Sequence, residues 1–81
     1  MYHVFHDPIS VRASFNSARI KITSFQWNKR TYTDLRTNLV HRVRMGRTPL
    51  LYVSLDDGAN YFKLLFDPET CEWWMEETSE V

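Results

Sequence analysis

The 81-residue chain has few of the residues that form disulfides or that favour turns: one cysteine, two glycines and three prolines. The single Cys71 cannot form an intrachain disulfide, and secreted chains of this size usually need such staples. We therefore expect a reducing, cytoplasmic setting. No charged-then-apolar leader begins the chain and no apolar run approaches bilayer length, so the sequence predicts neither an export signal nor a membrane span.

The chain also lacks the motifs that carry most catalysis. Neither a glycine-rich phosphate loop nor a nucleophile elbow occurs. The H-x-x-H-D run at residues 3–7 offers metal-ligand types, but this spacing matches no strong site signature. Asp56-Asp57 before Gly58 is more typical of a tight turn than of a catalytic carboxylate pair. We therefore predict no enzymatic activity, no cofactor and no bound metal.

Acidic residues are scarce in the first half of the chain and basic residues are scarce in the second, although the net charge is zero. Residues 11–50 carry nine lysines and arginines against Asp34 alone, and residues 51–81 carry eight acids against Lys63 alone. The two halves could pair within the fold or head to tail between molecules. They could also present a basic face to a polyanion.

What the sequence has in abundance is short alternating runs of β-branched and aromatic residues, with almost no helical periodicity. This pattern predicts a single all-β domain over residues 1–81, with short frayed termini. We expect about six antiparallel strands in a small, strongly curved sheet or partial barrel, with a meander in the C-terminal half. We also expect Thr78 to Val81 to fray.

In the first half, apolar residues alternate over residues 9–15, and Asn16-Ser17 is a turn candidate. Ile20 and Ile22 continue on one face, but Phe25 and Trp27 have the opposite parity. A bulge near residues 23–24 would keep all four inward. A tight turn is expected at residues 28–29, before Tyr32.

The middle of the chain is less clear. Residues 33–38 (TDLRTN) are compatible with a loop or one helical turn, and the GRTP stretch at 46–49 breaks the chain. Between them, four residues alternate with Val40, Arg42 and Arg44 and are expected to face inward: Leu39, His41, Val43 and Met45. A five-residue connection from Met45 to Leu51 would put Arg42 and Arg44 on the outer face beside Tyr52.

The last third gives the strongest pattern. Asp57-Gly58 predicts a two-residue hairpin turn, which would pair Leu55 with Asn60 and Val53 with Phe62. After the DPETC turn at 67–71, Phe66 could pair with Cys71 or with Trp73. Both registers give the same inward set: Phe62, Leu64, Phe66, Cys71, Trp73 and Met75. Trp73 is therefore predicted to be core and Trp74 to lie on the outer face.

That outer face is the candidate binding surface. Its predicted members are Tyr52, Tyr61, Lys63, Leu65 and Trp74, together with Arg42 and Arg44. Aromatics rimmed by charges are typical of self-association or of contact with another protein. Alternatively, the rings would stack on single-stranded nucleic acid while the three cations meet phosphates. Glu72 and Glu76 on the same face disfavour that alternative. Trp74 could also simply lie across Leu65, without a binding role.

Two segments resemble a known group. Phe25-x-Trp27 followed by Tyr32, and YFKLLFDPETCEW at 61–73, resemble patterns in short uncharacterised bacterial proteins. There an F-x-W-x-G-x-x-Y strand pair precedes a D-P-x-T-G-x-W hairpin. Similar segments accompany some lesion-bypass DNA polymerases of the Y family, which implies a nucleic-acid context but carries over no active site. The chain departs at both glycines, and Cys71 in the second position implies a strained left-handed residue or a different turn.

Overall fold

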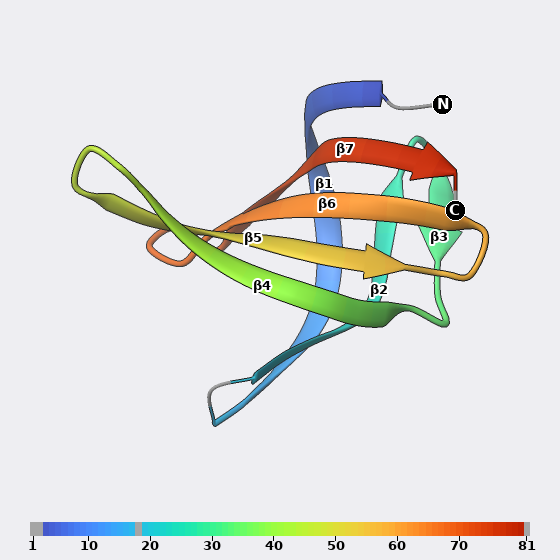
Figure 1. Cartoon of the computed structure of the whole chain (residues 1–81), viewed down its shortest axis with the longest axis horizontal. Helices are drawn as coiled ribbons and strands as arrows, with labels where there is room; N and C mark the ends of the chain where they lie inside the picture. Colours follow the sequence, from blue (N-terminus) through green and yellow to red (C-terminus); the bar gives the residue numbers. More distant parts are fainter. Residues whose placement is uncertain (1–2, 18, 81) are drawn as a thin grey trace.

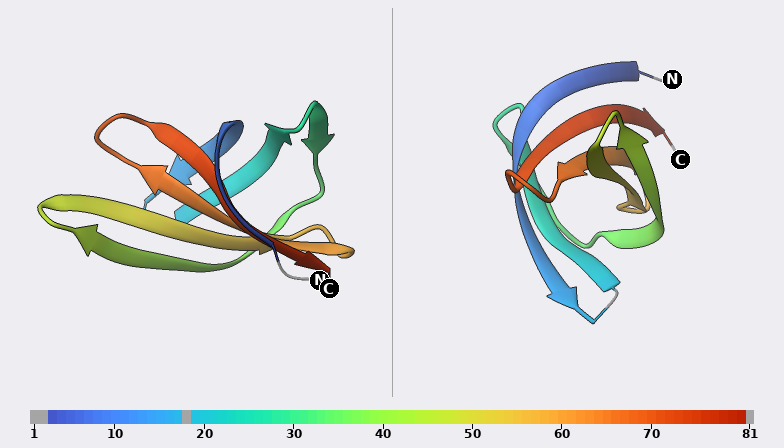
Figure 2. Two further views of the ribbon diagram at one scale, coloured as in Figure 1. Left: turned by 90° about the horizontal axis from the view of Figure 1, so that it is seen from above. Right: turned by 90° about the vertical axis from the view of Figure 1, so that its left-hand side faces the viewer.

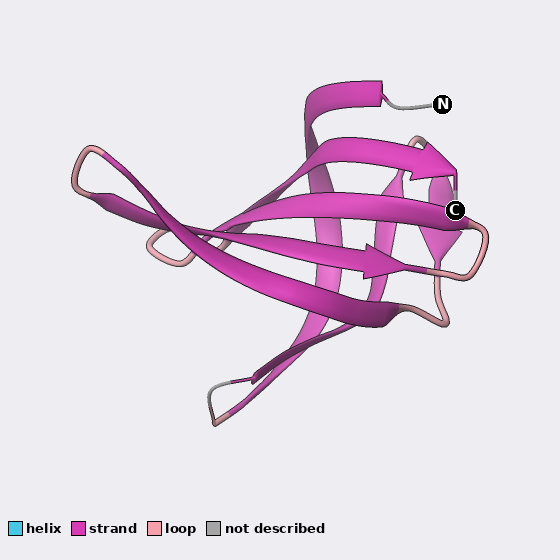
Figure 3. Ribbon diagram, in the orientation of Figure 1, coloured by secondary structure: helices cyan, strands magenta, loops and turns pink. Residues whose placement is uncertain are grey.

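The computed structural model describes residues 3–17 and 19–80, and these form an all-β protein without a helix (Figure 1, Figure 3). The seven strands are β1 (His3–Asn16), β2 (Arg19–Trp27), β3 (Arg30–Tyr32), β4 (Arg36–Met45), β5 (Thr48–Asp56), β6 (Asn60–Asp67) and β7 (Glu72–Glu80). They form one antiparallel sheet in the order β3-β2-β1-β7-β6-β5-β4. The predicted fold class is confirmed, with one strand more than expected.

The sheet curls strongly but does not close (Figure 2). The long strand β1 makes the bend possible, because its first part pairs with β7 and its second part pairs with β2. The β4–β5 hairpin extends to the left in Figure 1 and the β1–β2 hairpin extends downward. Within the described residues no ladder joins β2 to β4, so a seam remains open between them.

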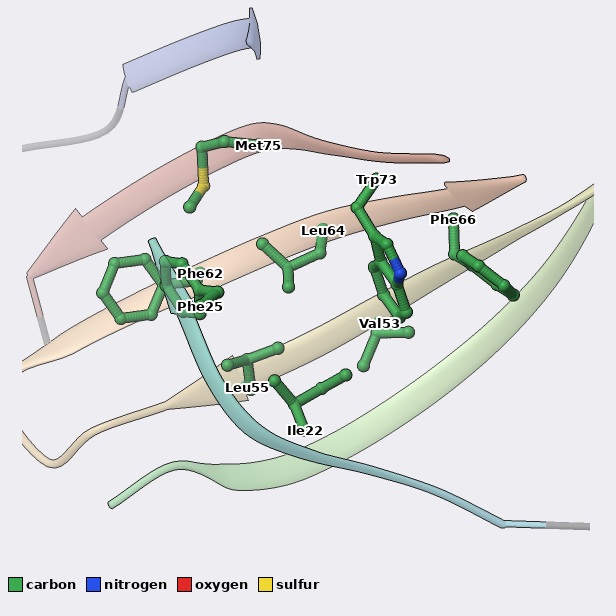
Figure 4. Close-up of a cluster of buried hydrophobic side chains, with 9 residues drawn as sticks. All are labelled: Ile22, Phe25, Val53, Leu55, Phe62, Leu64, Phe66, Trp73 and Met75. Atoms are coloured by element: carbon green, nitrogen blue, oxygen red, sulfur yellow. The ribbon is translucent and has the colours of Figure 1, made fainter. Parts of the chain in front are cut away.

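The core fills the inside of the curl (Figure 4). Its members come from β2, β5, β6 and β7: Ile22, Phe25, Val53, Leu55, Phe62, Leu64, Phe66, Trp73 and Met75. Phe25 meets Phe62 edge-on, with ring centroids 5.0 Å apart, across the space between β2 and β6. Trp73 is 8% exposed and stacks on Phe66 at 4.3 Å, which confirms it as the core tryptophan.

The predicted bulge in β2 is confirmed. Arg12 pairs with Ser24 and Ala13 pairs with Ile22, which leaves Thr23 as the extra residue. The insertion changes the parity of the strand, so both Ile22 and Phe25 are buried. Asn16 pairs with Arg19, so the first turn begins one residue later than expected, and position 18 lies outside the described residues.

The tight turn between β2 and β3 is also confirmed. Asn28 and Lys29 have φ angles of +52° and +63°, and Trp27 pairs with Arg30 on either side of them. Two consecutive positive φ values are what a type I′ hairpin turn requires. The turn places Tyr32 against Phe25, with ring centroids 4.9 Å apart.

The β5–β6 hairpin has a different register from the one predicted. Asp56 pairs with Tyr61 and Leu55 pairs with Phe62, so four residues separate the two ends of the hairpin pairing, and residues 57–59 connect the strands. Asp57 Oδ1 holds this loop by accepting hydrogen bonds from the backbone N–H groups of Ala59 (2.9 Å) and Asn60 (2.7 Å). The register is displaced by two residues, which is one side-chain period, so every side chain keeps its predicted face.

In the β6–β7 hairpin Phe66 pairs with Trp73, one of the two expected registers. Cys71 does not share the core face as predicted; it is exposed in the turn with a φ of +60°. Its backbone N–H donates to the Asp67 carbonyl at 2.7 Å. The expected fraying also does not describe residues 78–80, which pair with β6, while Val81 lies outside the described residues.

The β4–β5 hairpin overturns the predicted placement of two arginines. Met45 pairs with Thr48 across a two-residue turn, so Arg42 lies opposite Leu51 and Arg44 opposite Pro49. Leu51 packs against the core, and residues directly opposite in a pair share a face. Arg42 and Arg44 therefore lie on the inner side of the sheet, because the turn differs from the expected five-residue connection by an odd number.

The same register moves the apolar residues of β4. Leu39 lies opposite Ser54 and His41 opposite Tyr52, which puts both on the outer face rather than inward. The strand begins at Arg36, so residues 36–38 are extended, and the loop before it comprises residues 33–35.

Core and outer tryptophan should differ sharply in stability measurements. We expect Trp73→Ala to lower the free energy of unfolding by about 3–5 kcal/mol, because it removes a buried ring and leaves a cavity. Trp74→Ala should cost clearly less, because Trp74 is only half-buried. Denaturant midpoints of the two variants test this, and equal losses would contradict the assignment of faces.

The left-handed turn residue gives a second prediction. Cys71→Gly should raise the free energy of unfolding by about 1 kcal/mol, because glycine adopts a φ of +60° without the steric penalty of a Cβ atom. Cys71→Ala is the matched control, since it removes the sulfur but keeps the strain. Thermal unfolding in which alanine stabilises as much as glycine would show that the backbone is not the cause.

Candidate functional site

The candidate site is the outer surface of β4, β5, β6, β7 and β1. One row of side chains crosses all five strands, because each member lies directly opposite the next: His41, Tyr52, Leu65, Trp74 and Pro8. A second row runs beside it: Leu39, Ser54, Lys63, Glu77 and Val4. We call these two rows, with Tyr61 and His6, the outer aromatic face. The predicted members Tyr52, Tyr61, Lys63, Leu65 and Trp74 are thus brought together.

Leu65 forms the centre of the outer aromatic face. It is only 5% exposed, although it points away from the core, because Tyr52 and Trp74 flank it on the neighbouring strands. Both aromatic side chains are themselves half-buried. Two large rings on either side of a leucine form a continuous apolar strip across three strands.

Trp74 is held in place from β1. The His6 imidazole stacks on its ring, with centroids 5.3 Å apart and planes 8° from parallel. Glu76 Oε2 accepts a hydrogen bond from His6 Nδ1 at 2.6 Å. Sequence reasoning treated His6 only as a metal-ligand candidate, because nothing local in the sequence indicates that the first strand pairs with the last.

Lys63 is the cation at the middle of the face, and it already has partners. Its Nζ lies 4.5 Å from the centroid of the Tyr52 ring and 3.3 Å from Glu77 Oε2. Beside it, the Tyr61 hydroxyl donates to Ser54 Oγ at 3.0 Å. Because Arg42 and Arg44 lie on the inner side, Lys63 is the one predicted cation that the face retains.

A polar cluster closes one end of the face around Asp56, which is 8% exposed. The carboxylate accepts hydrogen bonds from Asn38 Nδ2 (2.9 Å) and the Gly58 N–H (3.1 Å), and Arg36 Nη2 lies 3.4 Å away. Asn38 reaches it because a bulge falls between Thr37 and Leu39. The pKa of Asp56 is lowered, and the hydrogen bond from Asn38 is the largest cause. Burial acts in the opposite direction and raises the pKa, whereas Gly58 and Arg36 lower it further.

The neighbouring carboxylate, that of Asp57, accepts hydrogen bonds within the β5–β6 turn. Burial raises the pKa of Asp57, but the hydrogen bonds from Asn60 and Ala59 outweigh that effect and lower it. Asp56 and Asp57 are therefore both held ionised by structural partners, as the turn interpretation of the sequence predicts.

The remaining predicted candidates do not gather into a site. Among residues 3–17 and 19–80, no three His, Cys, Asp or Glu side chains converge as metal ligands would. In the H-x-x-H-D run, His6 bonds to Glu76, and Asp7 accepts a hydrogen bond from Trp27 Nε1 at 3.1 Å.

Comparison with known proteins finds no family model, no curated protein and no solved structure that matches the chain. The resemblance to short bacterial proteins therefore stays a prediction. None of the described segments forms a helix with the length and hydrophobicity that a bilayer crossing needs.

The Asp56 cluster predicts a pH dependence of stability. A carboxyl whose pKa is lower in the folded state stabilises the fold above its unfolded pKa, and this contribution is lost as the pH falls through the folded value. Asp56 has an ordinary value of 3.8 and a lowered folded value, so the loss should occur below about pH 4. We expect Asp56→Asn to flatten the fall in unfolding free energy between neutral pH and pH ~3.

Asp34→Asn is the matched control, because Asp34 is an exposed acid and its φ of +55° suits asparagine. Urea unfolding of both variants across this range measures the effect. A profile of Asp56→Asn as steep as that of the unaltered protein would contradict the structural role of the carboxylate.

Proposed function

We propose that this chain is a small, non-catalytic binding module that pairs with a second copy of itself through the outer aromatic face. The β4–β5 register is the observation that carries the proposal. It places Leu39 opposite Ser54 and His41 opposite Tyr52, where the predicted register had Arg42 and Arg44. The exchange adds Leu39 to a face that already has the apolar strip of Tyr52, Leu65 and Trp74 beside charged side chains. Aromatic and aliphatic residues next to charged ones are the usual composition of a protein contact.

Binding of single-stranded nucleic acid through the same face is the weaker candidate. The face keeps one of its three predicted cations, and Lys63 already contacts Glu77 and the Tyr52 ring. Glu76 adds a carboxylate next to the imidazole that covers Trp74. Acids beside a phosphate path oppose binding, so the charge of this surface favours a protein partner.

The face is complementary to itself. The second row ends in exposed apolar residues on both sides, with Leu39 59% exposed on β4 and Val4 71% exposed on β1. Lys63 and Glu77 lie between them. A two-fold axis through Lys63, the middle residue of the row, would set Leu39 of one copy against Val4 of the other, and Ser54 against Glu77. The two Lys63 side chains would then meet at the axis, each beside the Glu77 of its own copy. This reciprocity is what an isologous dimer contact requires.

Sedimentation over a range of protein concentrations tests the proposal. We expect a dimer that persists at high salt, because apolar burial dominates the contact and salt does not weaken it. Leu39→Ser should raise the dimer dissociation constant at least about tenfold, since burial of a leucine contributes roughly 1.5–3 kcal/mol. Trp74→Ala should also abolish dimerisation by removing the central ring.

Met45→Ser is the control, because Met45 lies on the same strand and is similarly exposed, at 64%, but lies beside the β4–β5 turn. It should leave the dimer unchanged. A protein that stays monomeric at all concentrations would contradict the proposal. So would a tight oligonucleotide complex that weakens steeply with salt, because it would reverse the ranking of the two candidates.

A further inference from the structure

The open seam leaves a second candidate surface: the unpaired edge of β4. This strand pairs only with β5. Within the described residues, β2 approaches the other edge of β4 but forms no ladder with it. Beyond the short β3, residues 19–24 of β2 are unpaired on the side that faces the seam. Figure 2 shows β2 and the first part of β4 approaching each other, and a groove between them is lined by residues 19–21 and 35–40. Backbone donors and acceptors at such an edge are available to another chain.

The two hairpins that border the seam are both basic. Arg42, Arg44 and Arg47 belong to the β4–β5 hairpin, and Arg19 and Lys21 belong to β2. None of these five cations has an ionic partner within the part of the chain that the structure describes. Arg36, at the start of β4, is already paired with Asp56. Whatever binds along the edge therefore meets positive charge that nothing in the fold neutralises.

The two sides of β4 differ in chemistry. On the outer side lie Leu39, His41 and Val43, while the inner side carries Val40, Arg42 and Arg44. Several of these residues expose apolar surface, with Leu39 and Val40 among the large hydrophobic side chains left uncovered. A strand that pairs with this edge would place alternate side chains beside an apolar row and a cationic row.

We propose that the free edge of β4 binds an extended, acidic segment of another protein as an additional strand. Its backbone would hydrogen-bond to the edge, and its side chains would alternate between apolar residues on the outer side and Asp or Glu beside Arg42 and Arg44. Main-chain pairing supplies affinity in this mode of recognition, and the alternating side chains supply specificity.

The same observations disfavour two other occupants. A second β4 carries the same arginines and no acidic residue, so in any register it would leave the cationic row without a counter-charge. Single-stranded nucleic acid gains from aromatic stacking, whereas the exposed apolar side chains of β4 are aliphatic. An acidic polypeptide uses both the backbone groups and the arginines.

Fluorescence anisotropy with labelled synthetic peptides tests the proposal. The main probe is a capped peptide of about eight residues that alternates valine with glutamate, long enough to cover most of β4. We expect it to bind, and we expect backbone amides of β4 to gain protection from hydrogen exchange. Arg42→Glu should weaken binding at least about tenfold, the change expected when a cation opposite an acid becomes a like charge.

Two sets of controls keep the result specific. Arg12→Glu changes the same charge at an exposed position on β1, which β2 separates from the free edge of β4, and should alter affinity much less. A peptide with two adjacent prolines at its centre lacks an N–H on each of its edges and should not bind. A peptide with lysine in place of glutamate should also fail.

Several outcomes would overturn the proposal. Equal binding of the proline peptide would reduce the interaction to charge attraction without strand pairing, and a thymidine oligonucleotide that binds more tightly would assign the seam to nucleic acid. Absence of any peptide binding would also reject it. These results are separable from dimer formation, because Arg42 lies on the inner side and is not part of the outer aromatic face.

Discussion

A single sheet has no second layer to cover its apolar face, so this chain must bend the sheet around its own side chains. The bend depends on Thr23. Without the bulge, Ile22 and Phe25 would point to opposite sides of β2; with it, both reach the interior and Phe25 meets Phe62 from the far side of the curl. The core is a consequence of that one insertion, because β2 closes over the residues that β5, β6 and β7 supply.

Because the sheet does not close, its unpaired edges are exposed, and charged residues lie beside them. A curled sheet with an open seam keeps two unpaired edges, which are sites of unwanted association between copies. Arg19 on β2 and Arg42 and Arg44 on β4 lie on the strands that border the seam, and the acids of the second half lie on other strands and turns. The uneven charge noted in the sequence therefore does not serve mainly to pair the two halves within the fold. Among the described residues, the ion pairs with Lys or Arg are Arg36–Asp56 and Lys63–Glu77.

Sequence reasoning succeeded where a residue type left no alternative. The parity conflict between Ile22 and Phe25 required a bulge, and adjacent tryptophans in a strand had to separate into core and surface. The prediction failed at Arg42 and Arg44. A change of turn length by an odd number of residues moves every side chain of the strand to the opposite face, and neither the odd-numbered nor the even-numbered residues of β4 are clearly apolar. The His6–Trp74 stack was out of reach, since it depends on pairing between the two ends of the chain.

Both proposed surfaces share β4, and this sharing has a physical consequence. Leu39 and His41 belong to the outer rows, and Arg42 and Arg44 point the other way from the same ten-residue strand. A guest strand on the free edge would add its apolar side chains next to Leu39 and extend both outer rows by one strand. The outer aromatic face would then be larger in the complex than in the free protein. Strand addition and dimerisation would thus favour each other, because binding at the edge adds surface to the contact between copies.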